Sequence, residues 1–214
     1  MNKSFLNTSA IILMITAVFI DSARASSNSV RIWEESGSRY IQSNGIPDHE
    51  PGQFPNAGNP NSISSQEYTF RVPIFPRRAT NRTPVEHDFF GVSLNGVPFD
   101  PGTAEYWNND PSSGWNYEAM SGKIDLGLDH SHAHVQPNGA YHYHGIPSAS
   151  VGMSGSIKLI GYAADGFPIY YDRSARSSYR LKTGARPSGP GGRYDGSFVQ
   201  DHEYAEGTGD LDES

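Results

Sequence analysis

The chain has 214 residues, of which 36% are hydrophobic and 18% are charged, and its formal net charge is −7. This composition is typical of one globular domain and excludes a disordered or coiled-coil protein. The acidic balance gives no electrostatic reason to bind nucleic acid or an anionic membrane, because phosphate binding needs clustered positive charge. The sequence has no cysteine, which excludes disulfides, thiolate metal ligands and cysteine nucleophiles. Any metal must therefore be held by nitrogen and oxygen.

Residues 1–25 have the pattern of a secretory signal peptide. Lys3 lies near the start, an apolar run extends over residues 10–20, and Ala23-Arg24-Ala25 is typical of a cleavage site. A membrane anchor is the alternative, but this run is much shorter than the roughly 20 residues that span a bilayer. We expect a secreted or periplasmic protein without a membrane span after cleavage, with a net charge near −8 once Lys3, Asp21 and Arg24 are removed.

Residues 26–65 are rich in Asn, Ser, Gly and Pro, which predicts an irregular N-terminal segment. Only "VRIWEE" and "SRYIQS" within it have strand character, as one or two short edge strands. Residues 66–214 are predicted to form the β domain proper. Its first strand is "EYTFRVPIF", at residues 67–75, where apolar and polar residues alternate and prolines 73 and 76 favour an early end.

Two hairpins follow from their turn residues. Asn95-Gly96 and Asp165-Gly166 each separate two apolar runs, which is the strongest short-range hairpin signal. Convincing amphipathic helices are absent from the sequence pattern. We therefore predict an all-β or strongly β-biased single domain, sandwich-like, built of antiparallel hairpins with long Gly/Pro/Asn-rich loops.

Other candidate features have simpler explanations. The aromatic residues within 101–121 are expected to cover the core rather than to wall a pocket. The acidic tail that contains Asp195 and Asp201 lacks the spacing of a calcium loop, so a solvated, fraying terminus is expected there. His49 and His87 have no regularly spaced partners and are interpreted as surface residues.

The stretch "DHSHAHVQPNGAYHYHG", residues 129–145, contains five of the eight histidines. Side chains two residues apart on a strand point the same way, so His130, His132 and His134 are predicted to share one face. His142 and His144 share a face for the same reason. Whether the two faces coincide depends on the turn between the strands.

The turn residues favour a three-residue loop of Pro137, Asn138 and Gly139. Proline suits the first inner position of a type I turn, and glycine suits the left-handed residue of the bulge that follows. This register pairs His134 with His142 and His132 with His144, and all five imidazoles then share one face. A two-residue Asn-Gly turn would instead pair His134 with Tyr143 and separate the histidines.

Imidazoles on paired strands can converge on one ion, because facing Cβ atoms lie about 4.5–5.5 Å apart and Zn–N bonds measure about 2.0–2.1 Å. Nitrogen ligands without sulfur favour Zn, Cu, Ni or Fe over Ca or Mg. We predict a site for a divalent transition metal, with Zn or Cu favoured. The candidate ligands are His130, His134, His142 and His144, with His132 and Asp129 as further candidates. The alternative is a solvated hairpin with a polar histidine face.

Several blocks of the sequence resemble the YHYH domain family. "AYHYHG" (residues 140–145) follows "HVQPNG" and precedes "IGYAADGFPIYY" (160–171), while "FFGVSLNGVPFDP" (89–101) and "GRYDGSFVQDHEY" (192–204) are similar to the flanking blocks. The resemblance covers roughly residues 67–214. It implies an exported, β-rich module with a metal-binding histidine motif, and it implies no particular activity.

The resemblance also assigns positions. The motif proper is Tyr141, His142, Tyr143 and His144, with His134 upstream and Asp129-His130 at the start of the block. By the same resemblance, relatives often have an amide residue at the position of His132, which makes His132 a weaker candidate metal ligand than the other histidines. The ending "GDLDES" resembles the place where relatives continue with "LDEC" and further strand-like sequence, so the resemblance implies a C-terminus truncated relative to theirs.

The sequence contains no GxSxG elbow, HExxH pair or phosphate-binding glycine loop, which argues against serine hydrolases and nucleotide-dependent enzymes. The first hypothesis is an exported protein that binds a transition metal through a histidine-rich hairpin, for storage, delivery or a metal-dependent reaction. Whether it is an enzyme stays open at this point. The second hypothesis is a non-catalytic extracytoplasmic interaction module, with carbohydrate as a candidate partner.

Overall fold

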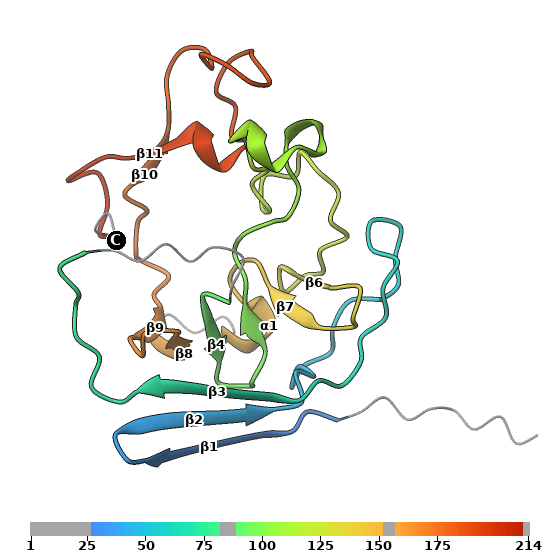
Figure 1. Cartoon of the computed structure of the whole chain (residues 1–214), viewed down its shortest axis with the longest axis vertical. Helices are drawn as coiled ribbons and strands as arrows, with labels where there is room; N and C mark the ends of the chain where they lie inside the picture. Colours follow the sequence, from blue (N-terminus) through green and yellow to red (C-terminus); the bar gives the residue numbers. More distant parts are fainter. Residues whose placement is uncertain (1–26, 82–88, 152–156, 212–214) are drawn as a thin grey trace, which may run out of the picture.

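The computed structural model describes residues 27–81, 89–151 and 157–211 (Figure 1). The predicted signal peptide and His87 lie outside the described residues. The described part is dominated by strands, with one short α-helix and three 3₁₀ turns, which confirms the predicted fold class. None of the described helices combines the length and apolar character that a membrane crossing requires.

The first sheet has three antiparallel strands in the order β1 (Val30–Glu35), β2 (Ser38–Ser43) and β3 (Tyr68–Pro73). The prediction of short edge strands is wrong for β2, which has six residues and pairs on both sides. The prediction that the next strand ends early is confirmed, because β3 stops at Pro73. β2 lies in the predicted N-terminal segment of residues 26–65 and β3 lies after it, and the two strands pair in one sheet.

The second sheet has six strands and carries the histidines. In spatial order it contains β6 (Ala133–Val135), β7 (Tyr141–Tyr143), β5 (Pro98–Phe99), β4 (Gly91–Ser93), β8 (Lys158–Ala163) and β9 (Pro168–Tyr171). Both predicted hairpins are present, and Gly96 and Gly166 have the left-handed φ values of +81° and +92° that their turns require. The pairing of β5 with β7 is parallel, whereas the other strand pairs are antiparallel.

The two sheets lie one over the other at the lower end of the molecule, with β1, β2 and β3 beneath β4 and β8 (Figure 1). Ile41, Val72 and Val92 are buried together between them. A second core cluster lies on one face of the histidine hairpin and includes Tyr141 and Tyr143. This arrangement is the sandwich-like packing that the alternation of apolar residues predicts.

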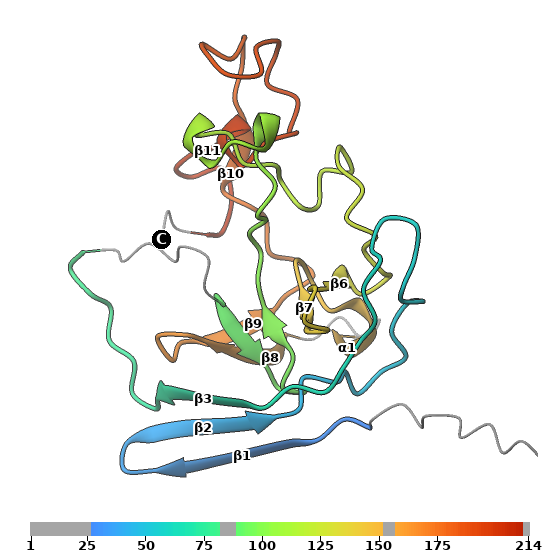
Figure 2. The ribbon, with the colours of Figure 1, turned by 45° about the vertical axis from the view of Figure 1, so that its right-hand side comes forward.

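The other end of the molecule is built mainly from loops (Figures 1 and 2). Tyr117 stacks on Phe198 at 4.6 Å between ring centroids, and Trp115 contacts the same ring at 5.7 Å. The prediction that loop aromatics cover a core is confirmed for these two residues. The remaining short elements are α1 (Ser148–Val151), η1 (Trp107–Asn109), η2 (Pro111–Ser113), η3 (Val199–Asp201), β10 (Tyr179–Leu181) and β11 (His202–Tyr204).

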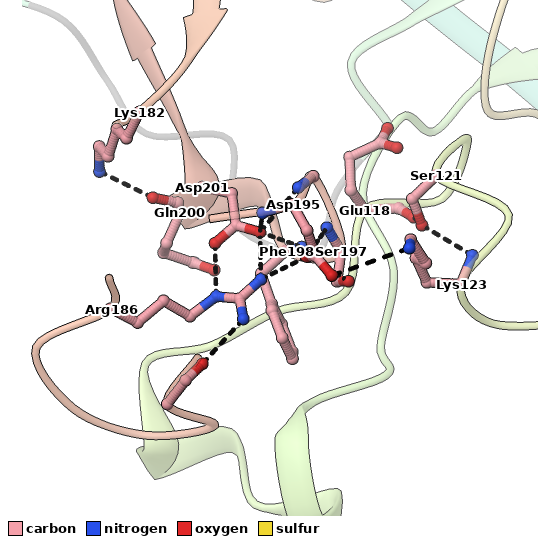
Figure 3. Close-up of polar contacts among 12 residues, drawn as sticks. Glu118, Ser121, Lys123, Lys182, Arg186, Asp195, Ser197, Phe198, Gln200 and Asp201 are labelled. Atoms are coloured by element: carbon pink, nitrogen blue, oxygen red, sulfur yellow. Dashed lines mark hydrogen bonds and ion pairs between the residues drawn. The ribbon is translucent and has the colours of Figure 1, made fainter. Parts of the chain in front are cut away.

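A buried ion pair organises the C-terminal segment (Figure 3). Arg186 donates from Nε to Asp201 Oδ1 at 2.8 Å and from Nη2 to Asp201 Oδ2 at 2.6 Å. The Arg186 side chain is 6% exposed and that of Asp201 is fully buried, so the prediction of a solvated acidic tail is wrong at Asp201. Nη2 also contacts the carboxylate of Asp195. Burial alone would raise the pKa of Asp201, but the hydrogen bonds from Arg186 and from backbone amides hold it below its usual value.

Candidate metal centre

The predicted three-residue loop sets the register of the histidine hairpin. His134 pairs with His142, and Ala133 pairs with Tyr143. Gly139 closes the loop with a φ of +85°, its N–H donates to the carbonyl of Gln136 at 2.8 Å, and a Cβ atom at this position would collide with the side chain of Ser64. The predicted pairing of His134 with His142 is therefore confirmed, and glycine is required at the loop by both backbone geometry and space.

Three imidazoles converge on one point from this hairpin. Nε2 of His144 lies 3.1 Å from Nε2 of His142 and 3.1 Å from Nε2 of His134. The ligand atoms of the three residues all lie within 4.8 Å of one another. Two nitrogens bound tetrahedrally to one zinc ion are about 3.3 Å apart, given Zn–N bonds of 2.0–2.1 Å. The spacing of the three Nε2 atoms is thus close to that of a shared first coordination shell.

Hydrogen bonds on the far side of two rings fix where their protons lie. His134 Nδ1 donates to the carbonyl of Leu126 at 2.8 Å, and His142 Nδ1 donates to the carbonyl of Ala140 at 3.2 Å. Carbonyl oxygens only accept, so Nδ1 carries the proton in both neutral rings and Nε2 presents a lone pair. At most one of the two short Nε2 contacts can then contain a proton, donated by His144. The other contact then has no proton of its own between its nitrogens, and a cation bound by the three Nε2 atoms would relieve this unsatisfied arrangement.

The environment keeps His142 and His144 neutral, as metal ligands must be. Burial, with the neighbouring His134 in second place, lowers the pKa of His142 to about 4. Burial also lowers the pKa of His144 to about 3, with contributions from His142 and His134. Nδ1 of His144 is buried without a well-formed hydrogen bond, although the nearby backbone of Pro101 and Gly102 partly opposes the lowering of its pKa.

The prediction that all five histidines share one face is wrong for His132 and His130. His132 adopts a left-handed φ of +57°, which breaks the alternation just before β6 begins, and its Nδ1 lies 2.7 Å from the carbonyl of Ile146. His130 precedes this turn and is exposed, with its ring 6.3 Å from that of His49. Neither histidine belongs to the group that can hold a metal in the described residues.

Asp129 also lies outside that group, because its carboxylate stabilises the turn. Oδ1 accepts from the backbone N–H groups of Ser131 at 2.8 Å and Ala133 at 3.2 Å. Oδ2 accepts from the hydroxyl of Tyr141 at 2.6 Å and from the N–H of Gly52 at 2.9 Å. The carboxylate therefore serves the tyrosine side of the hairpin, away from the three converging imidazoles.

The tyrosines of β7 lie on the opposite face from its histidines, as strand alternation predicts. Tyr143 is fully buried, and its hydroxyl lies 2.8 Å from Nε2 of His49 and 2.9 Å from Nδ2 of Asn95. Burial raises the pKa of Tyr143 to about 12. His49 is therefore a structural partner of the motif, and its interpretation as an isolated surface residue is wrong.

The imidazole face borders a cavity of about 550 Å³. His134 and His144 line it, together with residues that sequence reasoning missed: Asp100, Glu105, Gln136 and Gln200. Gln136 lies two residues after His134 in extended chain, so strand alternation alone would have predicted that both side chains share one face. Gln200 reaches the cavity from a segment far along the chain, and no local pattern predicts that contact.

Comparison with known proteins places the chain in a family. A search of curated proteins found no match, and a search of solved structures found none either. The sequence profile of the family described as YHYH protein matches residues 69–214, which is more than half of the chain and includes the whole hairpin. In the motif of the matched family, Tyr141 and Tyr143 point to a network of buried hydroxyl contacts, and His142 and His144 point to the imidazole cluster. The chain belongs to the YHYH family.

Proposed function

We propose that this protein is an exported metal-binding protein that holds one divalent transition ion, Zn²⁺ or Cu²⁺, through the Nε2 atoms of His134, His142 and His144. The observation that carries the proposal is the convergence of three Nε2 atoms at 3.1 Å contacts while two of the rings donate their Nδ1 protons to carbonyls. Carbonyl partners of this kind orient imidazole ligands and fix their tautomer. Export is supported by the signal-peptide pattern of residues 1–25.

The surroundings favour a reactive or ligand-accepting site over storage and delivery. Three protein ligands leave one position of a tetrahedral ion open, and open positions distinguish catalytic sites from structural ones. His142 is fully buried and His144 is 7% exposed, which disfavours the rapid exchange that a delivery protein needs. His134 and His144 border the cavity, so the open position has a space from which a ligand can approach. An ion held by these three residues would supply Lewis acidity.

Metal analysis of the chain purified without a histidine tag tests the proposal. We expect one equivalent of Zn²⁺ or Cu²⁺ after loading, and a rise in melting temperature as metal is added, because metal binds the folded state. His142→Ala is expected to weaken binding by more than about 100-fold, since even residues that merely support a metal ligand change affinity about 10–100-fold. His132→Ala is the matched control, because it removes an imidazole of the same hairpin outside the cluster and is expected to retain the metal.

The metal analysis also distinguishes the metal-binding protein from the second hypothesis, a non-catalytic interaction module. If no divalent transition ion binds stoichiometrically, or if His132→Ala and His142→Ala lose metal equally, the three-histidine site is refuted. A non-catalytic interaction module would then be the better interpretation. Unfolding by urea in the presence of a chelator shows whether each variant is folded without metal, so that a loss of metal is not confused with a loss of structure.

A further inference from the structure

The cavity beside the three imidazoles has the size of a small-molecule site. Its volume of about 550 Å³ lies inside the range of about 300–1,000 Å³ that is usual for such sites. The hairpin contributes Gln136 and two histidines to its wall, and the segment that follows β5 contributes Asp100 and Glu105. In Figure 1 this segment runs from the six-stranded sheet towards the loop-rich end of the molecule. The cavity therefore lies where the sheet meets that end.

The charge of the cavity wall disfavours anions. None of the described residues that line it is lysine or arginine, whereas Glu105 contributes a carboxylate that forms no ion pair within the described residues. A carboxylate, phosphate or sulfate group entering the cavity would face the like charge of Glu105 without a basic partner among the described residues of the wall, which costs binding energy. The wall therefore favours a ligand that is neutral or cationic over an anionic one.

The hydrogen-bonding groups of the wall distinguish between those two classes. Within the described residues, the side chains of Gln136 and Glu105 make no hydrogen bond, while Gln200 uses only Oε1, which accepts from the N–H of Asn116 at 2.9 Å. The wall thus offers amide N–H donors as well as carboxylate acceptors. A hydroxyl group can both accept and donate, but an ammonium group can only donate and would leave the amide donors unpaired.

Aromatic side chains complete the wall. Phe90, which is 42% exposed, and Tyr106 both line the cavity, so the prediction that the aromatic residues within 101–121 cover the core rather than wall a pocket is wrong for Tyr106. Such rings supply flat apolar surface beside polar groups, which suits a ligand with hydroxyls at its edge and C–H groups on its face. The cavity therefore combines three features: no cationic side chain, mixed amide and carboxylate partners, and aromatic surface.

From these features we propose that the cavity binds a neutral saccharide, as a free sugar or as the end of a longer glycan. The charge and hydrogen-bond arguments stand on Glu105, Gln136 and Gln200. The proposal rests on the proposed function only in placing the sugar beside the three imidazoles. Vicinal hydroxyls of the sugar then lie next to the open side of the His134 and His144 pair.

Titration calorimetry on the purified chain, with and without one equivalent of Zn²⁺, tests this proposal. The probes are a panel of neutral hexoses, the matching hexuronic acids and hexosamines, and short oligosaccharides of the neutral sugars. We expect a neutral sugar to bind at least about 10-fold more tightly than its uronic acid, in line with the cost of like charges. Tighter binding of the oligosaccharide identifies a glycan end as the ligand, and equal binding identifies the free sugar.

Two pairs of variants connect the binding to the cavity. Gln136→Leu is expected to weaken the neutral sugar by about 5- to 10-fold through lost hydrogen bonds, whereas Gln42→Leu, at an exposed position of β2, is expected to leave it unchanged. Glu105→Gln is expected to narrow the difference between neutral sugar and uronic acid, and Glu35→Gln at an exposed position of β1 is its control.

The outcomes for metal and sugar can be separated. If zinc binds at one equivalent but no neutral sugar binds the zinc-loaded or the zinc-free protein, the saccharide proposal is overturned and the metal site stands. If a sugar binds and responds to Gln136→Leu while zinc does not bind, the metal site is overturned and the saccharide site stands. Preference for the uronic acid, or equal effects of Gln136→Leu and Gln42→Leu, would also overturn the saccharide proposal.

Discussion

Replacing Arg186 with alanine is expected to destabilise the protein by about 3–5 kcal/mol, the usual cost of leaving one partner of a buried ion pair uncompensated. The structure supports a value in this range. Asp201 is fully buried, and Arg186 reaches both of its carboxylate oxygens, at 2.8 and 2.6 Å. After the change, Oδ2 of Asp201 retains one backbone hydrogen bond of ordinary length, from Gly196 at 3.0 Å, and two longer ones, from Asp195 at 3.3 Å and Phe198 at 3.4 Å. These contacts cannot replace a guanidinium group held in two-point contact.

A surface pair on the neighbouring strands provides the control. Arg180 contacts Glu203 at 3.0 Å between β10 and β11, but the two side chains are 63% and 40% exposed. Solvent screens this pair, so Arg180→Ala is expected to cost less than about 1 kcal/mol. Both variants remove one arginine from the C-terminal segment. Arg186→Ala removes the buried pair with Asp201 and a contact with the half-exposed Asp195, whereas Arg180→Ala removes one exposed pair.

Equilibrium unfolding in urea, with a chelator present to keep the protein free of metal, measures both effects. With an m value of about 2 kcal/mol per molar, Arg186→Ala is expected to lower the midpoint by about 1.5–2.5 M, and Arg180→Ala by less than about 0.5 M. A midpoint for Arg186→Ala equal to that of Arg180→Ala, at unchanged m value, would refute the reasoning. The buried pair would then contribute no more than an exposed one.

Three further predictions concern pH, the loop and the tyrosine face. The lowered pKa of Asp201 contributes stability that is present above its unfolded pKa of about 3.9 and is lost as the pH falls through the folded pKa. Without Arg186 the buried carboxylate gains a proton more readily, so the urea midpoints of wild type and Arg186→Ala should converge as the pH falls from about 7 to about 4. A difference between the midpoints that widens over this range would contradict the reasoning. Gly139→Ala is expected to cost more than about 1 kcal/mol, because φ is +85° and the new methyl group meets Ser64; thermal unfolding checks it, and a neutral effect would show that the loop can relax. Tyr143→Phe should cost about 1–3 kcal/mol, because the buried Asn95 and the half-buried His49 each lose a hydrogen-bond partner, while metal stoichiometry stays at one. Loss of the metal together with unchanged stability would contradict the separation of the two faces.

The register of the site was predictable because its determinants are local. Pro137, Asn138 and Gly139 specify one loop length, and loop length decides which residues of two adjoining strands face each other. The structure has this loop and pairs His134 with His142. The same argument predicted both other hairpins from their Asn-Gly and Asp-Gly turns.

The errors have a physical cause in common, which is that side chains rearrange the backbone or reach across the chain. Asp129 binds the N–H groups two and four residues ahead, and His132 takes a left-handed conformation within that turn, so period-two alternation does not extend to it. The wall of the cavity and the pair of Arg186 with Asp201 depend on contacts between segments far apart in sequence. Patterns within a short window contain no information about such contacts.

One strand, β7, presents tyrosine and histidine side chains alternately to two unlike environments. A slip of one residue in its pairing would turn the tyrosine hydroxyls towards the cavity and bury the imidazoles against the apolar core. Insertions or deletions within residues 137–144 therefore cannot be absorbed as in ordinary surface loops. The convergence of the imidazoles and the hydrophobic packing would be lost in the same event, so that a misregistered chain would lose both the proposed metal site and stability. Because tyrosine and histidine alternate in this motif, the stability of the hairpin depends on its correct register.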